Sequence, residues 1–238
     1  MKKAVLFLSI ITLAIIAFSS CKKVSGEGPI VTETRSIADF SEIKSQFSGN
    51  TYVTYGPTYS VTIEAQQNII DALETTLSNG RLTVKVKEKT VLDPDETVKV
   101  HITTPNILGL FVSGSGNMYV INKMLSSDLI LKVNGSGNIN IAELEANNIN
   151  GEISGSGEIN IAAGKVNRQT LDISGSGSMD LLNLESKNAD IKISGSGNAS
   201  LFVTDNLKVR ISGSGNVSYK GNPAVDVNIT GSGKLNHL

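Results

Sequence analysis

Apolar and polar residues alternate along most of the second half of the chain, and this alternation recurs. Aliphatic side chains stand at every second position before and after a Gly-Ser-Gly triplet. A period of two, carried largely by β-branched residues, is typical of strands that bury one face. No helical spacing of 3.6 residues competes with it. The pattern therefore predicts an all-β region over residues 109–238.

The triplet belongs to a four-residue repeat motif, which we call the word, and this motif occurs seven times at intervals of 18 to 21 residues. A near-fixed period of about twenty residues indicates a repeat architecture whose units bury a face against their neighbours. We therefore expect a parallel β-solenoid, similar to a β-helix, with about seven coils. Alternation within the word predicts that Gly114 and Gly116 both face inward, as do their equivalents. A flexible Gly-Ser linker is excluded because the flanking aliphatic columns keep their register. The copies begin at Ser113, Asn134, Ser154, Ser174, Ser194, Ser212 and Thr230.

Residues 30–108 lack the word but also favour strands, and we expect them to form a hairpin-rich part that caps the solenoid. The pattern predicts a hairpin of residues 50–55 and 59–65, a helical turn at 67–71, a second hairpin around Asn79-Gly80 and a polar loop at 87–96. The chain stops four residues after Lys234. The last coil therefore has little cover, and its open strand edge predicts end-to-end self-association.

The N-terminus carries an export signal. Two lysines at positions 2 and 3 precede an apolar run over residues 4–18, which is short for a transmembrane helix. Small residues then lead to Cys21, the only cysteine, and this resembles the lipobox of bacterial lipoproteins. An ordinary signal peptide beside an incidental cysteine is the alternative, but a lone cysteine lacks a disulfide partner. We expect residues 1–20 to be a signal peptide, Cys21 to be lipidated and residues 21–29 to form a tether.

The charge balance and composition exclude several classes of ligand. Without residues 1–20 the chain has 19 basic and 22 acidic residues, so there is no basic footprint for nucleic acid. It contains two histidines and no tryptophan. The last repeat ends in Lys234 but lacks the other residues of a phosphate loop. Asparagine replaces the aspartate of calcium-binding β-rolls in four copies, where a calcium site needs clustered carboxylates. No cofactor or metal is expected.

An enzyme that cleaves polysaccharides would need a pair of carboxylates a few ångströms apart. Asp172, Asp180 and Asp190 lie on neighbouring coils, and Glu152 and Glu158 flank one turn. Alternation places Asp172 and Asp190 on the outer side, and no His, Arg or Tyr is grouped with them in the sequence. The pattern therefore favours a non-enzymatic protein, with a polysaccharide lyase or hydrolase of the β-helix type as the alternative.

Polar residues after each triplet form the candidate ligand-binding surface. Alternation turns them outward, where turn formation and hydrogen bonding between coils are their ordinary roles. The alternative is a flat polar ladder that recognises a glycan or a protein. Tyr52, Tyr55 and Tyr59 are the densest aromatic group, suited either to hairpin packing or to stacking on sugar rings. The residues of the candidate surface are Ser115, Asn117, Asn138, Asn198 and Asn216.

From Ile37 onward the chain resembles the family called putative auto-transporter adhesin, head GIN domain. The resemblance covers about 200 of the 238 residues and includes Thr103-Thr104-Pro105 and the repeated Gly-Ser-Gly-Asn. It implies a parallel β-helix-like fold on secreted or lipid-anchored proteins of Bacteroidota, without a catalytic motif. We therefore expect an adhesion, binding or scaffolding module of the cell envelope, anchored by its lipid, in the outer membrane. Lys22 and Lys23, in place of acidic residues after the cysteine, favour its periplasmic face over the cell surface.

Overall fold

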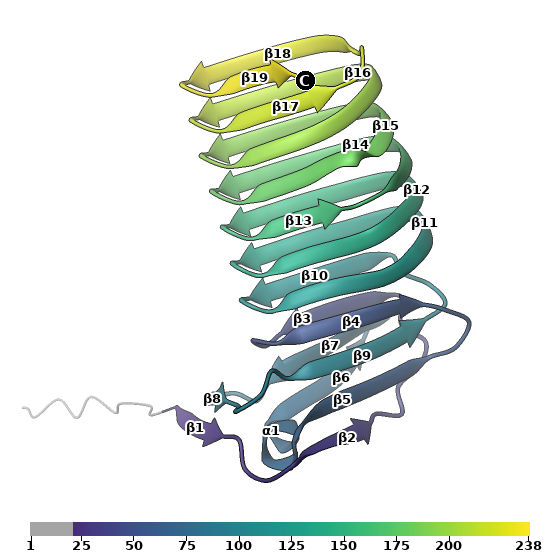
Figure 1. The fold of residues 1–238 in the computed structure, drawn as a ribbon, viewed down its shortest axis with the longest axis vertical. Coiled ribbons are helices and arrows are strands. Elements are labelled where there is room, and N and C mark those ends of the chain that lie inside the picture. Colours follow the sequence, from purple (N-terminus) through teal and green to yellow (C-terminus); the bar gives the residue numbers. More distant parts are fainter. Residues whose placement is uncertain (1–20) are drawn as a thin grey trace, which may run out of the picture.

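The computed structural model describes residues 21–238, so the expected signal peptide lies outside the described residues. Strands stack into a tall spool with one short helix near its base (Figure 1). The lower elements are β1 (Lys22–Ser25), β2 (Ile30–Thr34), β3 (Glu42–Gln46), β4 (Asn50–Tyr55), β5 (Ser60–Gln66), α1 (Gln67–Asp71), β6 (Leu73–Ser78), β7 (Arg81–Val86), β8 (Thr90–Asp93) and β9 (Lys99–Thr104). The repeat elements are β10 (Gly109–Gly114), β11 (Asn117–Gly135), β12 (Asn138–Gly155), β13 (Glu158–Ile161), β14 (Gly164–Gly175), β15 (Ser178–Gly195), β16 (Asn198–Gly213), β17 (Asn216–Lys220), β18 (Ala224–Gly231) and β19 (Lys234–His237).

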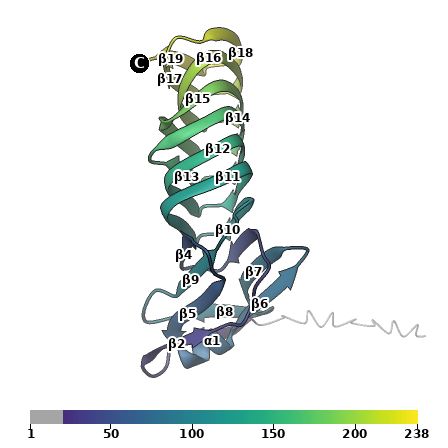
Figure 2. The ribbon, with the colours of Figure 1, turned by 90° about the vertical axis from the view of Figure 1, so that its right-hand side faces the viewer.

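The repeat region is a parallel β-solenoid, which confirms the predicted fold class. Strands of successive coils pair in parallel from β10 to β19, and the side view shows the flattened coils one above another (Figure 2). The first glycine of every word meets the equivalent glycine of the next coil. The seven words therefore mark equivalent corners of one winding chain. These glycines are Gly114, Gly135, Gly155, Gly175, Gly195, Gly213 and Gly231.

Parallel stacking continues below the first word, across the expected boundary at residue 109. Gly109 of β10 lies over Glu42 of β3, and Asn117 of β11 lies over Asn50 of β4. Below these strands, β7 pairs with β3 and β9 pairs with β4, again in parallel. We call each pair of facing parallel strands a level, so the stack has nine levels, from β7 and β9 at the base to β18 and β19 at the top. Ser48-Gly49-Asn50 occupies a corner equivalent to the Gly-Ser-Gly-Asn corners above it.

The base contains one predicted hairpin but not the other. β6 and β7 pair antiparallel across Asn79-Gly80, whose φ angles of 50° and 73° suit the tight turn, so this prediction is confirmed. The hairpin of residues 50–55 and 59–65 is wrong, because β9 lies between β4 and β5 and pairs with both. The side chains of Val100 and Ile102 on β9 continue the buried columns of the solenoid. That burial outweighs the local turn signal.

The segment that follows Cys21 is part of the fold. β1 pairs in parallel with β8, and the Lys22 amide donates to the Lys89 carbonyl at 2.7 Å. Residues 22–25 of the expected tether are therefore held against the base, and the expected polar loop at 87–96 contains a strand. Both strands are short and largely exposed, with little apolar alternation, so the sequence pattern does not predict their pairing. The predicted helical turn is confirmed as α1.

The two glycines of each word have different roles. The prediction that both face inward is correct for the second glycine and wrong for the first. Gly175 has a φ of 120° and is only partly buried, and a Cβ atom on it would point at the Gly155 carbonyl oxygen of the level below, so the strand bends there. The second glycine, Gly177, is buried as expected. A Cβ atom on it would lie 2.5 Å from Ile153 Cγ2 and 2.6 Å from the Gly157 carbonyl oxygen. The alternation keeps its parity across the corner, since Ile173, Gly177 and Met179 are all buried, and only the first glycine departs from it.

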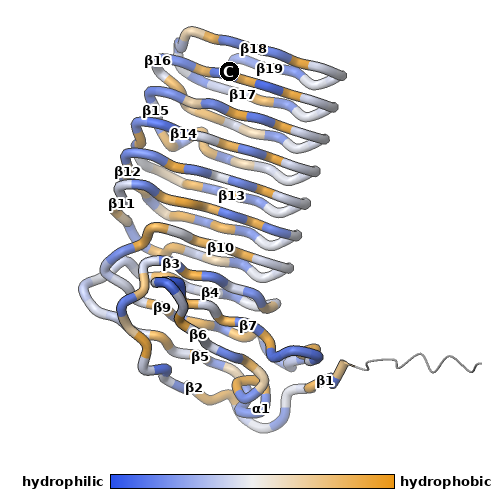
Figure 3. The backbone as a smooth tube through the Cα atoms, turned by 180° about the vertical axis from the view of Figure 1, so that it is seen from behind, coloured by the Kyte–Doolittle hydropathy of each residue, from blue (hydrophilic) through white to orange (hydrophobic). Residues whose placement is uncertain are grey.

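The interior is a set of aliphatic columns, seen as the alternating apolar and polar positions along each strand (Figure 3). Val133, Ile153, Ile173 and Ile193 are all fully buried in one such column. α1 covers the lower end of the core with Ile69 and Ile70, which are also fully buried. Among residues 21–238, no helix has the length and apolar character needed to cross a bilayer.

Candidate ligand-binding face

Each coil has two flat sides, and their outward side chains form two chemically different surfaces. We call the first the amide face. Its central column, from the base upward, is His101, Tyr52, Tyr119, Asn140, Asn160, Asp180, Ser200, Ser218 and Asn236. The column beside it, nearer the corners, is Lys99, Asn50, Asn117, Asn138, Glu158, Ser178, Asn198, Asn216 and Lys234.

Three aromatic rings are stacked at the lower end of the amide face. The rings of Tyr52 and His101 have centroids 5.2 Å apart and planes within 17° of each other. The rings of Tyr52 and Tyr119 have centroids 5.4 Å apart and planes within 19°. Parallel strands are about 4.8 Å apart, so aromatic side chains in one register column are brought to stacking distance. The result is a continuous aromatic strip on the outside of the solenoid.

Asparagine amides bond from level to level beside this strip. Asn117 donates through Nδ2 to Asn50 Oδ1 at 3.3 Å, and Asn138 donates in the same way to Asn117 at 2.8 Å. Higher up, Asn216 donates to Asn198 at 3.0 Å. Each bridged amide keeps further donor and acceptor capacity toward solvent. The expected hydrogen bonding between coils is present, and the ladder is interrupted where Glu158 and Ser178 replace asparagine.

Ser115 of the candidate surface and two of the three grouped tyrosines lie away from this ladder. Ser115 lies at the exposed corner between the two glycines, in a different column from Asn117. The tyrosine group is also divided. The Tyr59 ring packs on the Phe40 ring with centroids 5.1 Å apart, and Tyr55 packs against the core. Only Tyr52 of the three reaches the amide face.

A groove of about 500 Å³ adjoins the aromatic strip. Tyr119 and the amides of Asn50 and Asn117 line one side of it. The segment before β9 lines the other side, with the exposed acids Asp95 and Glu96. A strip of stacked aromatic rings therefore borders a hollow that offers amide donors, amide acceptors and carboxylates.

A charged cluster lies at the foot of the strip. Lys99 Nζ donates to Glu64 Oε1 at 2.8 Å, and His101 Nε2 is 3.7 Å from Glu64 Oε2. The hydrogen bond from Lys99 lowers the pKa of the Glu64 carboxyl below its ordinary value of 4.5, and partial burial opposes this shift. The same contact raises the pKa of Lys99. The cluster thus keeps Glu64 ionised beside the His101 ring.

The opposite surface, which we call the ion-pair face, contains most of the acids weighed as catalytic groups. Its central column is Thr83, Lys44, Phe111, Lys132, Glu152, Asp172, Lys192, Arg210 and Asn228. The column beside it is Arg81, Glu42, Gly109, Ile130, Asn150, Thr170, Asp190, Lys208 and Asp226. Acids and bases on neighbouring levels pair across this surface.

Each of the two leading acids has a cationic neighbour. Asp190 is 2.7 Å from Arg210, and Asp172 is 3.6 Å from Lys192. The structure therefore places an arginine beside Asp190, contrary to the sequence expectation that none is grouped there. Side-chain exposures of 33% to 56% make these pairs solvated surface contacts. Within residues 21–238, no three His, Cys, Asp or Glu side chains are close enough together to hold a metal ion.

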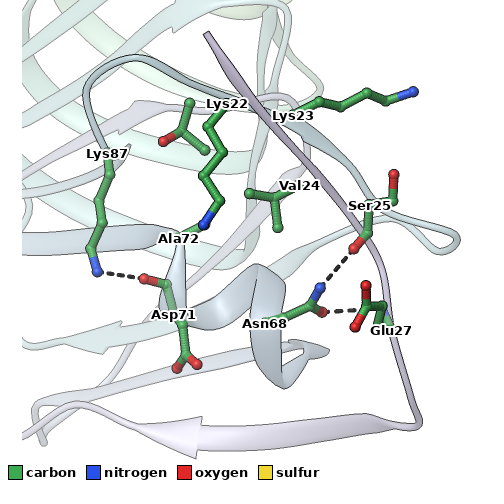
Figure 4. Close-up of a pocket in the computed structure, with 10 residues that line it drawn as sticks. Lys22, Lys23, Val24, Ser25, Glu27, Asn68, Asp71, Ala72 and Lys87 are labelled. Atoms are coloured by element: carbon green, nitrogen blue, oxygen red, sulfur yellow. Dashed lines mark hydrogen bonds between the residues drawn. The ribbon is translucent and has the colours of Figure 1, made fainter.

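The strand that follows Cys21 lines a separate hollow at the base, of about 410 Å³ (Figure 4). Asn68 of α1 donates to the Ser25 carbonyl at 2.7 Å and accepts from the Glu27 amide at 3.1 Å. A hydrogen bond from Lys23 lowers the pKa of the Asp93 carboxyl. These contacts tie the strand after Cys21 to the base. Cys21 itself is exposed and has a free thiol.

Tyr119 and His101 of the aromatic strip were not predicted from the sequence. Gly49-Asn50-Thr51-Tyr52 and Gly116-Asn117-Met118-Tyr119 are identical at three of four positions. Aligning these two segments would have placed the two tyrosines in one column. His101 carries no such signal, because β9 follows no copy of the word.

Comparison with known proteins agrees with this geometry. The sequence profile of the family "Putative auto-transporter adhesin, head GIN domain" matches residues 39–223, which confirms the expected resemblance. No curated protein sequence matches the chain.

Three solved structures share the fold. A "putative adhesin" from Bacteroides fragilis has a TM-score of 0.84 at 20% identity, covering 90% of this chain and 100% of its own. A "putative lipid binding protein" from Parabacteroides distasonis has a TM-score of 0.77 at 25% identity, covering 91% and 100%. A "putative adhesin" from Parabacteroides merdae has a TM-score of 0.74 at 25% identity, covering 91% and 99%.

Proposed function

Because the chain belongs to the "putative auto-transporter adhesin, head GIN domain" family, we propose that it is a non-enzymatic adhesion module of the cell envelope. In this proposal Cys21 carries the lipid that anchors it, and the amide face binds a carbohydrate chain. The family description and the names of the similar structures agree with an adhesive role.

The observation that carries the proposal is the aromatic strip that continues into the asparagine column. The C–H faces of a sugar ring pack on aromatic rings, and its hydroxyls both donate to and accept from amides. Tyr119, whose ring is stacked on Tyr52 on one side, supplies the first kind of contact, and Asn140 and Asn160 directly above it supply the second. A chain laid along the solenoid axis would meet a new polar side chain about every 4.8 Å.

The anchor is supported by the position of Cys21 at the foot of the spool. The residue is exposed and directly precedes β1, which is paired with β8. Acylation there would hold the base at the membrane, with the amide face standing away from the bilayer. Lys22 and Lys23 favour the periplasmic leaflet of the outer membrane. Mass spectrometry of the membrane fraction tests this, since Cys21→Ser should remove the acyl mass and release the protein.

A binding screen against glycans and envelope fractions, with unlipidated residues 22–238, tests the ligand. The wild type and Lys192→Ala on the ion-pair face should bind the same glycan, whereas Tyr119→Ala should lose it. Binding that survives Tyr119→Ala but disappears with Lys192→Ala would overturn the assignment of the face. The absence of any glycan ligand would overturn the proposed ligand class.

A polysaccharide lyase or hydrolase is the alternative, and it has less support. Asp190 is ion-paired with Arg210, Asp172 with Lys192, and Glu152, the register neighbour of Asp172, with Lys132. The same screen distinguishes the two functions, because an enzyme would release oligosaccharides from the bound polymer. Release that stops in Asp190→Asn would replace the adhesion proposal.

A further inference from the structure

The upper end of the solenoid exposes the cross-section of its core. In the last complete level below it, Leu207 and Val209 are 1% and 0% exposed. Val225 and Val227 continue the same two inward columns one level higher, and they are 40% and 47% exposed. These side chains point into the spool, so their exposure comes from missing cover above them. We call this end, formed by β18 and β19, the tip.

The tip also has two open strand edges. Within residues 21–238, β18 pairs only with β16, and β19 pairs only with β17. Each strand therefore presents a row of backbone N–H and C=O groups without strand partners. β18 runs for eight residues with one charged side chain, Asp226. Natural sheets usually protect such edges, because an open edge is a template for pairing with another strand.

At the opposite end of the spool the core is covered, although the edge strands β2 and β6 also pair on one side only within residues 21–238. Antiparallel β5 and β2 continue the sheet below β9, and α1 packs beneath them. Val61, Ile69 and Ile70 are fully buried there. Stacking through both ends, which would build an open filament, is therefore disfavoured. The asymmetry favours an assembly that closes after two molecules meet through their tips.

The sequence of β18 is complementary to itself in an antiparallel pair centred on Val227. In that register Val225 lies opposite Ile229 of the second copy, so the inward apolar positions meet. Asp226 lies opposite Asn228 of the second copy, where the amide can donate to the carboxylate. No two like charges face each other. A two-fold contact of this kind uses the same patch on both molecules and closes at a dimer.

We propose that two copies of this protein associate tip to tip, through antiparallel pairing of their β18 strands. The tip lies at the far end of the spool from β1, the strand that follows Cys21 (Figure 1), about 40 Å above the lowest parallel level. A tip-to-tip dimer anchored at both bases would join two facing membranes. This bridging role rests on the proposed lipid anchor, whereas the pairing itself does not.

Sedimentation velocity on unlipidated residues 22–238 tests the pairing. The wild type should shift from monomer to dimer as its concentration rises, and Val227→Asp should stay monomeric because two carboxylates would meet at the axis. Val91→Asp is the matched control, since Val91 is 52% exposed at the base, and it should dimerise as the wild type does. A wild type that stays monomeric throughout, or equal loss of the dimer in the control, overturns the proposal.

Cysteine cross-linking in a Cys21→Ser background tests the register. Residues directly opposite in an antiparallel pair have Cα atoms about 4.5–5.5 Å apart, which suits a disulfide. Oxidised Val227→Cys should form a covalent dimer, and Val225→Cys should cross-link only when mixed with Ile229→Cys. Circular dichroism shows whether each variant is folded. Cross-links from Val91→Cys but none from the tip variants would overturn the contact, independently of any result on glycan binding.

Discussion

The amide face and the ion-pair face lie on the same nine levels and share one backbone register, yet they differ in chemistry. Above its aromatic strip the amide face has mostly short uncharged side chains, with Glu158, Asp180 and Lys234 as the exceptions. The ion-pair face has mostly charged side chains, which pair between levels. The interior columns and the glycine corners, which both faces share, hold the levels together. The outward positions are therefore free to specialise, because exposed contacts add little to stability.

The largest expected effect lies at the corners, where both faces depend on the same glycines. Gly175→Ala should lower the free energy of unfolding by about 2–5 kcal/mol, since a φ of 120° strains any side chain and the new Cβ would lie 2.5 Å from the Gly155 carbonyl oxygen. Urea denaturation followed by circular dichroism measures this. The neighbouring exposed Ser176→Ala is the control and should change stability by less than about 0.5 kcal/mol. Equal effects of both variants would contradict the proposed role of the corner.

The next largest effect is a loss of glycan affinity, which we expect for substitutions on the amide face only. Tyr119→Ala should weaken binding of the glycan found in the screen at least about tenfold, or about 1.4 kcal/mol, because a truncated aromatic side chain loses its stacking surface. Tyr119→Phe keeps the ring in the column with Tyr52 and should retain most of the affinity. Isothermal titration calorimetry measures both variants. If the phenylalanine variant lost as much as the alanine variant, the hydroxyl rather than the stacked ring would carry the contact.

A smaller effect is expected on the ion-pair face. The coupling free energy between Asp190 and Arg210 should be below about 1 kcal/mol, because both side chains are exposed enough for water and salt to screen them. A double-mutant cycle with Asp190→Ala and Arg210→Ala, measured by urea denaturation, gives this value. A coupling of several kcal/mol would show that this surface contributes to the stack as the corners do.

The smallest expected effect is a pH dependence at the foot of the amide face. The pKa of Glu64 is lowered in the fold, chiefly by the hydrogen bond from Lys99. The stabilisation is therefore present above the ordinary pKa of 4.5 and is lost as the pH falls below it through the lowered value. Denaturation midpoints of the wild type and Glu64→Gln should differ at neutral pH and converge in acid. A constant difference between them would contradict the linkage.

Much of the solenoid could be predicted from the sequence, because the motifs that mark it are local and repeated. Each word marks a corner, and the flanking aliphatic residues mark the interior. The lower levels were harder to predict, because β9 enters the stack from a distant part of the chain and separates β4 from β5. The pairing of β1 with β8 was not predicted either, because these two strands are also far apart in the chain. Neither strand carries enough apolar alternation to identify its partner.

The candidate face was only partly predictable. Asn117 and Asn138 were identified as an outward ladder, and their hydrogen bond is present. The aromatic strip was missed, because Tyr52 was grouped with Tyr55 and Tyr59, its neighbours in sequence. The structure instead places its ring between the rings of His101 and Tyr119. Register across levels, rather than distance along the chain, decides which rings stack.

The sequence by itself determined the repeat, its strand period, the glycine corners and the apolar interior, since each depends on residues a few positions apart. Only the tertiary structure decided which levels lie next to each other at the base and which side chains of the base share an outward column with those of the repeats. These features depend on pairing between segments far apart in the chain. Pairing of that kind is selected by the burial of whole strands, which no single segment specifies.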